Sequence, residues 1–169
     1  MRRAPAPPGA HGAPLGVRVF SAAAAQGGVD SPDVIVLCHT DSTQGGPPSN
    51  SAALRLAYAL PDCMFGGPGE VTAWLPALGH CFAVVASLLR QRRLQHGSRA
   101  AVLRIAVVCR AGRERSVSVA SMLLMLFNGM SLEAAFAHVE EHATRDSAAQ
   151  RTVDMLNAAT AVSDALCFV

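Results

Sequence analysis

Hydrophobic runs and polar breaks alternate along the chain in a pattern that predicts both strands and helices. Short runs rich in valine, isoleucine and leucine occur at residues 17–20, 33–38, 54–60 and about 102–108, and we expect each to form a β-strand. A short helical turn is expected at residues 22–25, between the first two strands. Because helical patterns also separate and follow the later strands, the sequence predicts an α/β fold.

The longer helices can be placed from apolar residues that recur at spacings of three and four. One such stripe starts at Trp74, a side chain that we expect in the core, and continues to Leu89. Because proline is tolerated only in the first turn of a helix, Pro76 places the start of this helix at about residue 73 or later. Further helices are expected at residues 116–127, after an N-cap serine at residue 131, and at 147–164.

The order of these elements predicts a three-layer sandwich. Its central sheet should hold four or five mostly parallel strands, with helices on its flanks. Residues 1–14 contain four prolines and two glycines, and we expect a flexible tail there, followed by a single domain over residues 15–169. Ligands of such open sheets bind beyond the carboxyl ends of the strands, so the functional residues should follow a central strand.

Composition and charge narrow the function classes. The 169 residues are 51% hydrophobic and 15% charged, which favours a folded globular protein. The net charge of +2 is too small to indicate a nucleic-acid partner, and the arginines at 90, 92 and 93 suit the end of a helix dipole. No apolar run approaches the ~20 residues that span a bilayer, so we expect a cytoplasmic protein without a membrane span.

Cysteines and histidines are not arranged as metal sites. The five cysteines include no C-x-x-C pair, so neither a disulfide framework nor a zinc site is expected. His39 has no second ligand at metal-ligand spacing, and His138 and His142 share a helix face without an acidic or cysteine partner. We therefore expect no metal and no cofactor.

The strongest chemical signal is the segment from Cys109 to Ser116. A β-branched run ends in a cysteine, a loop with one glycine and three arginines follows, and an apolar helix begins. Free N–H groups at a helix start, together with amides of residues 110–115 curled toward one centre, make an oxyanion site. Gly112 permits the tight backbone, and Arg115 offers bidentate donors that match a phosphate.

The thiol at the other end of this loop predicts nucleophilic chemistry. A cysteine pKa near 8.5 is lowered by helix N-termini and neighbouring cations, which gives Cys109 thiolate character. Such a thiolate can attack a phosphorus atom held in the loop. Ser116 follows the loop and can donate a hydrogen bond to the sulfur when it leaves.

This segment resembles the signature of the cysteine-based protein phosphatases, which is Cys, five residues, Arg, then Ser or Thr. The helix, turn and Met-Ser-Leu-x-x-Ala segment over residues 116–139 look like those that follow the loop in dual-specificity phosphatases. The resemblance implies hydrolysis of phosphorylated tyrosine, serine or threonine in proteins through a phosphocysteine intermediate. It assigns the nucleophile to Cys109, phosphate binding to Arg110, Ala111, Gly112, Arg113, Glu114 and Arg115, sulfur release to Ser116, and the general acid to Asp62 with Glu70 as the alternative.

Three departures keep other readings open. Val108 stands where the family usually has a histidine that orders the loop, which favours a pseudophosphatase that binds phosphorylated partners without turnover. Arg110 and Arg113 are similar to basic residues of phosphoinositide and phosphatidylglycerophosphate phosphatases, so a phospholipid substrate is an alternative. Glu114 before the arginine is similar to rhodanese-type cell-cycle phosphatases, in which the acid could come from the loop itself.

Overall fold

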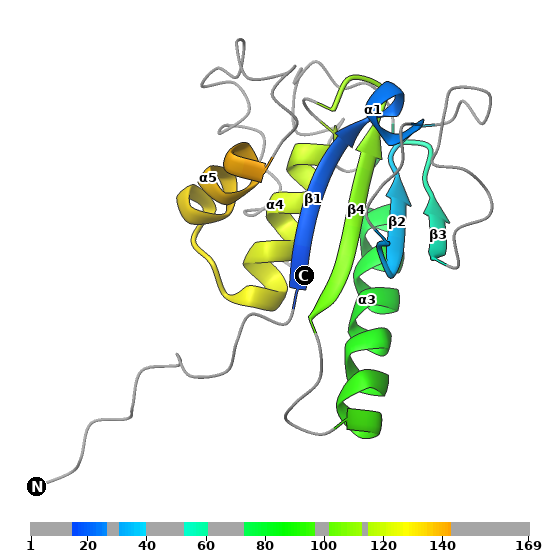
Figure 1. Ribbon diagram of the computed structural model, residues 1–169, viewed down its shortest axis with the longest axis vertical. Coiled ribbons are helices and arrows are strands. Elements are labelled where there is room, and N and C mark those ends of the chain that lie inside the picture. The colour runs from blue at the N-terminus through cyan, green and yellow to red at the C-terminus, as the bar shows by residue number, and fades with distance from the viewer. Residues whose placement is uncertain are drawn as a thin grey trace, which may run out of the picture.

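The computed structural model describes residues 15–26, 31–39, 53–60, 73–96, 102–112 and 115–142. For Gln26, Glu141 and His142 it describes the backbone only. The predicted tail at 1–14 and the predicted helix at 147–164 lie outside these residues. The described elements are four strands and four helices, which are mixed along the chain (Figure 1). They are β1 (Leu15–Ser21), α1 (Ala22–Gln26), β2 (Val34–Leu37), β3 (Leu54–Ala57), α3 (Leu75–His96), β4 (Leu103–Cys109), α4 (Arg115–Asn128) and α5 (Leu132–His142).

The four strands form one parallel sheet in the order β1-β4-β2-β3, which confirms the predicted parallel architecture. β4 lies between β1 and β2 and pairs with both, so that Ile105 is opposite Val17 on one side and Val34 on the other. The carboxyl ends of all strands therefore meet at one edge (Figure 1). β4 ends there at Cys109.

Both faces of β4 are buried, which explains its nearly continuous apolar sequence. Ile105, Val107 and Cys109 belong to the main hydrophobic core, each at most 2% exposed. Because side chains alternate along a strand, Val108 points to the opposite face, where it packs with Ile35 in a second, smaller cluster. The nucleophile candidate and the residue before it therefore lie on different faces of the sheet.

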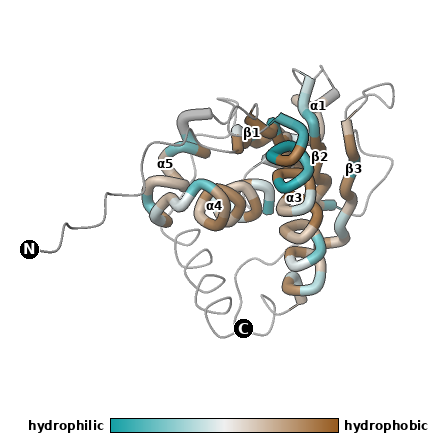
Figure 2. The backbone as a smooth tube through the Cα atoms, turned by 90° about the horizontal axis from the view of Figure 1, so that it is seen from below, coloured by the Kyte–Doolittle hydropathy of each residue, from teal (hydrophilic) through white to brown (hydrophobic). Residues whose placement is uncertain are grey.

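Three helices pack on the face of the sheet that carries the main core. α3 and α4 lie side by side beneath the strands, with α5 beyond α4 (Figure 2). Trp74 is 3% exposed, as expected of a core residue. Among the described helices, α1 alone packs against the other face, through Ala25. The buried helical side chains on the main face include Leu78, Phe82, Val85, Leu123, Leu124 and Val139.

The predicted starts of α3 and α5 are confirmed. α3 begins at Leu75, so Pro76 lies in its first turn. The hydroxyl of Ser131 accepts the N–H of Ala134 at 3.2 Å, which caps α5 as expected. The pKa of Glu133 is lowered by its own backbone N–H and by the Ser131 hydroxyl. No helix in the described part of the chain is long and apolar enough to cross a membrane.

β3 is shorter than the predicted strand at 54–60. The pairing continues only as far as the N–H of Tyr58, which donates to the carbonyl of Leu37 at 2.8 Å. The chain then forms a three-residue γ-turn, in which the N–H of Leu60 donates a hydrogen bond to the carbonyl of Tyr58 at 3.0 Å. This turn directs residue 60 toward the start of α4, where it contacts Arg115.

Candidate active site

The segment from Cys109 to Ser116 joins the carboxyl end of β4 to the start of α4, as the sequence predicts. Arg110, Ala111 and Gly112 follow the strand, while Arg113 and Glu114 lie outside the described residues. The side chains of Arg110 and Ala111 are exposed at this edge of the sheet. The loop therefore lies where open parallel sheets bind their ligands.

The sulfur of Cys109 is held by groups from both ends of the loop. The N–H of Gly112 points at Sγ at 3.1 Å, and the Oγ of Ser116 lies 3.0 Å from the same sulfur. Cys109 is 2% exposed and Ser116 is fully buried. The chain is thus curled around the sulfur rather than extended, and two hydrogen-bonding groups can stabilise a thiolate there.

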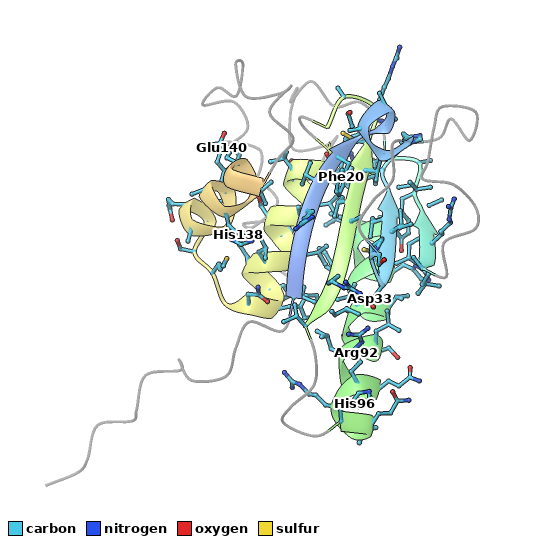
Figure 3. The ribbon with its side chains drawn as sticks, viewed as in Figure 1. Phe20, Asp33, Arg92, His96, His138 and Glu140 are labelled. Carbon is cyan, nitrogen blue, oxygen red and sulfur yellow. The ribbon has the colours of Figure 1, made fainter. Side chains whose placement is uncertain are left out.

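Gly112 is required at its position for two independent reasons. Its φ of +67° lies in the left-handed region, which residues with a Cβ seldom adopt. A Cβ at this position would also lie 2.7 Å from the backbone N of Ser21 and 3.0 Å from the carbonyl carbon of Phe20. Phe20 marks the same end of the sheet in Figure 3. The end of β1 therefore supports the loop from outside.

Arg115 is the first residue of α4, and its guanidinium is turned inward. The side chain is 8% exposed, and Nη1 donates to the carbonyl of Leu60 at 3.0 Å. This contact links the start of α4 to the segment after β3. The two candidate acids, Asp62 and Glu70, come later on that segment and lie outside the described residues.

A second cysteine lies beside the nucleophile candidate. Leu37 pairs with Val108, and the N–H of Cys38 donates to the carbonyl of Val108 at 2.8 Å. Cys38 therefore adjoins Cys109 on the neighbouring strand, facing the same core. Burial raises the pKa of the Cys38 thiol well above its usual value, and the nearby Cys109 raises it further. The sequence alone could not decide whether Cys38 or Cys63 lies near Cys109, because strand order was not predicted.

The surroundings of Val108 are apolar. Val108 is fully buried in the smaller cluster, where Ala25, Ile35 and Ala106 are its companions and Phe20 packs against the edge. A histidine at this position would bring two ring nitrogens into an apolar environment. The valine therefore fits the face of the sheet on which it lies.

Metal ligands do not gather in the part of the chain that the structure describes, since no three His, Cys, Asp or Glu side chains are placed to share an ion. His39 follows Cys38 after the end of β2, and its Nε2 is buried with no hydrogen-bond partner among the residues that the structure describes. His138 lies on α5, away from the carboxyl edge of the sheet (Figure 3). Nothing in the described residues therefore assigns a metal to the loop.

Comparison with known proteins gives the fold. No protein-family model matches the chain, and no curated protein sequence matches it. The structure of human DUSP28 is 22% identical, covers 90% of this chain and 94% of its own, and superposes with a TM-score of 0.55. This chain has the fold of the dual-specificity phosphatases.

A second solved structure agrees. A mouse protein described as a dual-specificity phosphatase, in complex with zinc tungstate, is 22% identical, with coverage of 98% of this chain and 92% of its own and a TM-score of 0.54. Identity at this level supports the dual-specificity phosphatase fold and no finer property.

Proposed function

We propose that the protein is a cytoplasmic, cysteine-dependent phosphatase that hydrolyses phosphorylated tyrosine, serine or threonine in protein substrates. The observation that carries this proposal is the pair of contacts at the sulfur of Cys109, from the Gly112 N–H and the Ser116 hydroxyl. A buried structural cysteine does not need a glycine in the left-handed region and an amide directed at its sulfur. A nucleophile at the base of an anion-binding loop needs both the left-handed glycine and the amide directed at its sulfur.

In the first proposed step, the Cys109 thiolate attacks phosphorus. A sulfur–phosphorus bond forms, the bond from phosphorus to the substrate oxygen breaks, and Asp62 gives that oxygen a proton. The loop amides and the Arg115 guanidinium stabilise the charge on the three equatorial oxygens. The inward orientation of Arg115, fixed by the Leu60 carbonyl, supports this role.

In the second proposed step, water attacks the phosphocysteine. Asp62, now a carboxylate, takes a proton from the water, a phosphorus–oxygen bond forms and the sulfur–phosphorus bond breaks. The sulfur leaves as a thiolate, which a hydrogen bond from Ser116 at 3.0 Å stabilises. Inorganic phosphate is the product.

Asp62 is preferred to Glu70 because of the chain's connectivity. The carbonyl of Leu60 accepts a hydrogen bond from Arg115, and the two peptide units between residues 60 and 62 span at most about 7 Å. Asp62 is only two positions after Leu60 in the sequence, whereas Glu70 is ten positions after it, so the proposal prefers the residue closer along the chain to this contact. The test compares Asp62→Asn with Glu70→Gln, and loss of about 10²-fold or more in kcat is expected for the first alone.

The second candidate function is binding without turnover. The apolar surroundings of Val108 and the 2% exposure of Cys109 favour it, because the described side chains that pack around Val108 carry no charge that could order the loop. A loop of this shape would still bind a phosphate. The sulfur would then act only as an acceptor for the Gly112 amide.

The deciding experiment measures hydrolysis of p-nitrophenyl phosphate, phosphopeptides and phosphoinositides by the wild type, Cys109→Ser and Arg115→Lys. We expect turnover only in the wild type, with phosphopeptides preferred to phosphoinositides, while Cys109→Ser still binds tungstate. Equal rates for wild type and Cys109→Ser would instead establish the binding protein. A preference for the lipid would change the substrate class, and loss of activity in Glu114→Gln but not Asp62→Asn would place the acid in the loop.

A further inference from the structure

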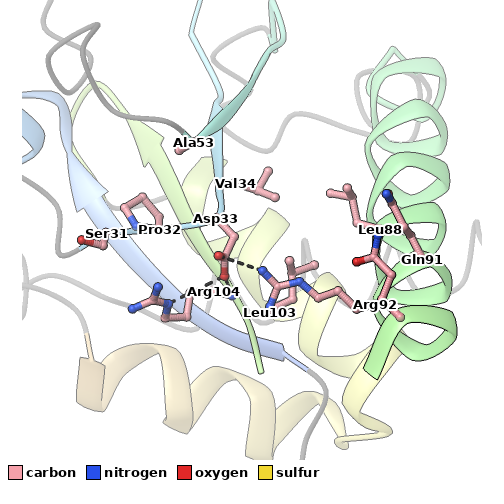
Figure 4. Close-up of a pocket in the computed structure, with 11 residues that line it drawn as sticks. Ser31, Pro32, Asp33, Val34, Ala53, Leu88, Gln91, Arg92, Leu103 and Arg104 are labelled. Carbon is pink, nitrogen blue, oxygen red and sulfur yellow. Dashed lines mark hydrogen bonds and ion pairs between the residues drawn. The ribbon is translucent and has the colours of Figure 1, made fainter. Parts of the chain in front are cut away.

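A cavity of about 520 Å³ opens at the amino ends of the strands, at the other end of the sheet from Cys109 (Figure 4). Its walls come from the residues before and within the start of β2, from the start of β4 and from the last turns of α3. We call it the basal pocket and define it by Asp33, Val34, Leu88, Arg92, Leu103 and Arg104. Since β4 has seven residues, about 20 Å separates this pocket from the loop.

One carboxylate holds two guanidinium groups at the basal pocket. Oδ1 of Asp33 lies 2.8 Å from Nη2 of Arg92, and Oδ2 accepts the backbone N–H of Arg104 at 2.8 Å. Nε of Arg104 is 3.7 Å from the same Oδ2. Figure 4 shows Asp33 between the two arginines, which leaves a formal charge of +1 on the three side chains. The pocket is therefore preorganised for a negatively charged partner.

The accessible cation of this group is Arg104. Its side chain is 60% exposed, against 26% for Arg92 and 24% for Asp33. Arg92 is further fixed by donation from Nη1 to the carbonyl of Val102 at 3.2 Å. An incoming carboxylate would thus meet Arg104 first, without displacing the buried side of the network.

Apolar surface continues from the floor of the basal pocket onto its rim. Val34, Leu88 and Leu103 line the cavity. Next to it, Leu54 and Val102 are 42% and 47% exposed, two of the four large apolar side chains that are well exposed among the described residues. Both are tied to the ion network, because the Leu54 N–H donates to the Asp33 carbonyl at 3.0 Å and the Val102 carbonyl accepts from Arg92.

We propose that the basal pocket is a docking site for an acidic segment of a protein partner. A carboxylate of that segment pairs with Arg104, and an apolar side chain enters the cavity against Leu88 and Leu103. Gln91 and Gln95 also line the pocket, and their amides donate and accept hydrogen bonds as a peptide backbone requires. A lipid chain offers no such groups. The proposal does not depend on catalysis at Cys109.

The test uses the full chain and fluorescence anisotropy of three fluorescein-labelled octapeptides. The first alternates glutamate with leucine, the second replaces glutamate with lysine, and the third replaces leucine with alanine. We expect binding of the first peptide only, weakened by added salt. Arg104→Glu should reduce affinity by about tenfold or more, because it reverses a charge-assisted contact. Arg93→Glu, an equal change of charge at an exposed position of α3 outside the pocket, should change affinity less than about twofold.

Melting temperatures of both variants and of the milder Arg104→Gln separate loss of binding from loss of folding. If Arg104→Glu unfolds, Arg104→Gln decides, with about a threefold weaker affinity expected from loss of one charge. The proposal is overturned if the lysine peptide binds as well as the glutamate peptide, if the arginine variants bind like wild type, or if anionic lipid vesicles bind and no peptide does. Cys109→Ser should bind the first peptide with the affinity of the wild type. The two proposals can therefore fail separately: loss of peptide docking leaves the phosphatase proposal intact, and absence of hydrolysis leaves the docking proposal intact.

Discussion

Replacing Gly112 with alanine tests whether the loop depends on the end of β1. The new Cβ would lie 2.7 Å from the backbone N of Ser21, closer than real Cβ contacts, so one of the two backbone segments must move. The φ of +67° at this residue adds a separate conformational cost. Since the Gly112 N–H is directed at the sulfur of Cys109, any movement also disturbs the proposed nucleophile.

The expected loss of stability in Gly112→Ala follows from these two costs, the conformational one and the steric one. A left-handed conformation costs an L-residue about 1–2 kcal/mol, and overpacking against backbone costs about 1–3 kcal/mol more. We expect the free energy of unfolding to fall by roughly 3 kcal/mol, and the melting temperature by about 6–12 °C for a chain of this length. Hydrolysis of p-nitrophenyl phosphate should fall at least about tenfold, because the amide that supports the sulfur has moved.

Gly129→Ala is the matched control. Gly129 has an almost identical φ of +66°, but a Cβ there would have no atom within 4 Å. Gly129→Ala should cost only the conformational part, about 1–2 kcal/mol or about 2–8 °C, and leave the rate unchanged. Thermal unfolding by circular dichroism measures both variants. Equal melting temperatures, with equal rates, would refute the idea that β1 supports the loop.

Four further substitutions test the packing. Val108→His puts an imidazole in an apolar, fully buried position, and we expect about 1–3 kcal/mol of destabilisation in urea unfolding, so unchanged stability would show a polar partner on that face. Asp33→Asn removes the carboxylate that holds Arg92 and should cost about 1–2 kcal/mol in the same assay. Ser131→Ala removes the cap of α5 at a cost of about 1 kcal/mol, which Ser131→Asp should largely restore. Gly79→Ala, in the exposed interior of α3 with nothing near its Cβ, should stabilise by about 0.5–1 kcal/mol, and a lower melting temperature would contradict the helix there.

Local features of the fold were predictable from the sequence. β4, the loop after it and α4 follow one another along the chain, so a β-branched run, a glycine and an apolar helix were enough to predict them. The cap at Ser131 and the place of Pro76 in α3 likewise depend on residues only a few positions apart. Such features are set by backbone geometry and by neighbours within a turn or two.

Contacts between distant residues were not predictable in this way. The sequence indicated only that Arg92 suits a helix dipole, yet Arg92 pairs with Asp33, 59 positions earlier. The carboxylate at the start of a buried strand did not indicate which arginine it would pair with. The contact between Arg115 and Leu60, and the place of Cys38 beside Cys109, depend on the strand order. The hydrophobic pattern specifies which face of a strand is buried, but not which strand becomes its neighbour.

The alternation of side chains along β4 limits what can activate the sulfur. Cys109 faces the main core and Val108 faces the smaller cluster, so a histidine at position 108 would act on the loop from the far side of the sheet. In this chain the described side chains that pack around Val108 are apolar. The groups that the structure places against the sulfur come from the loop side, where the Gly112 amide and the Ser116 hydroxyl lie 3.1 and 3.0 Å from it. Because the backbone holds the amide in place, the rate of the proposed hydrolysis should depend more on the fit of Gly112 against β1 than on the side chain at position 108.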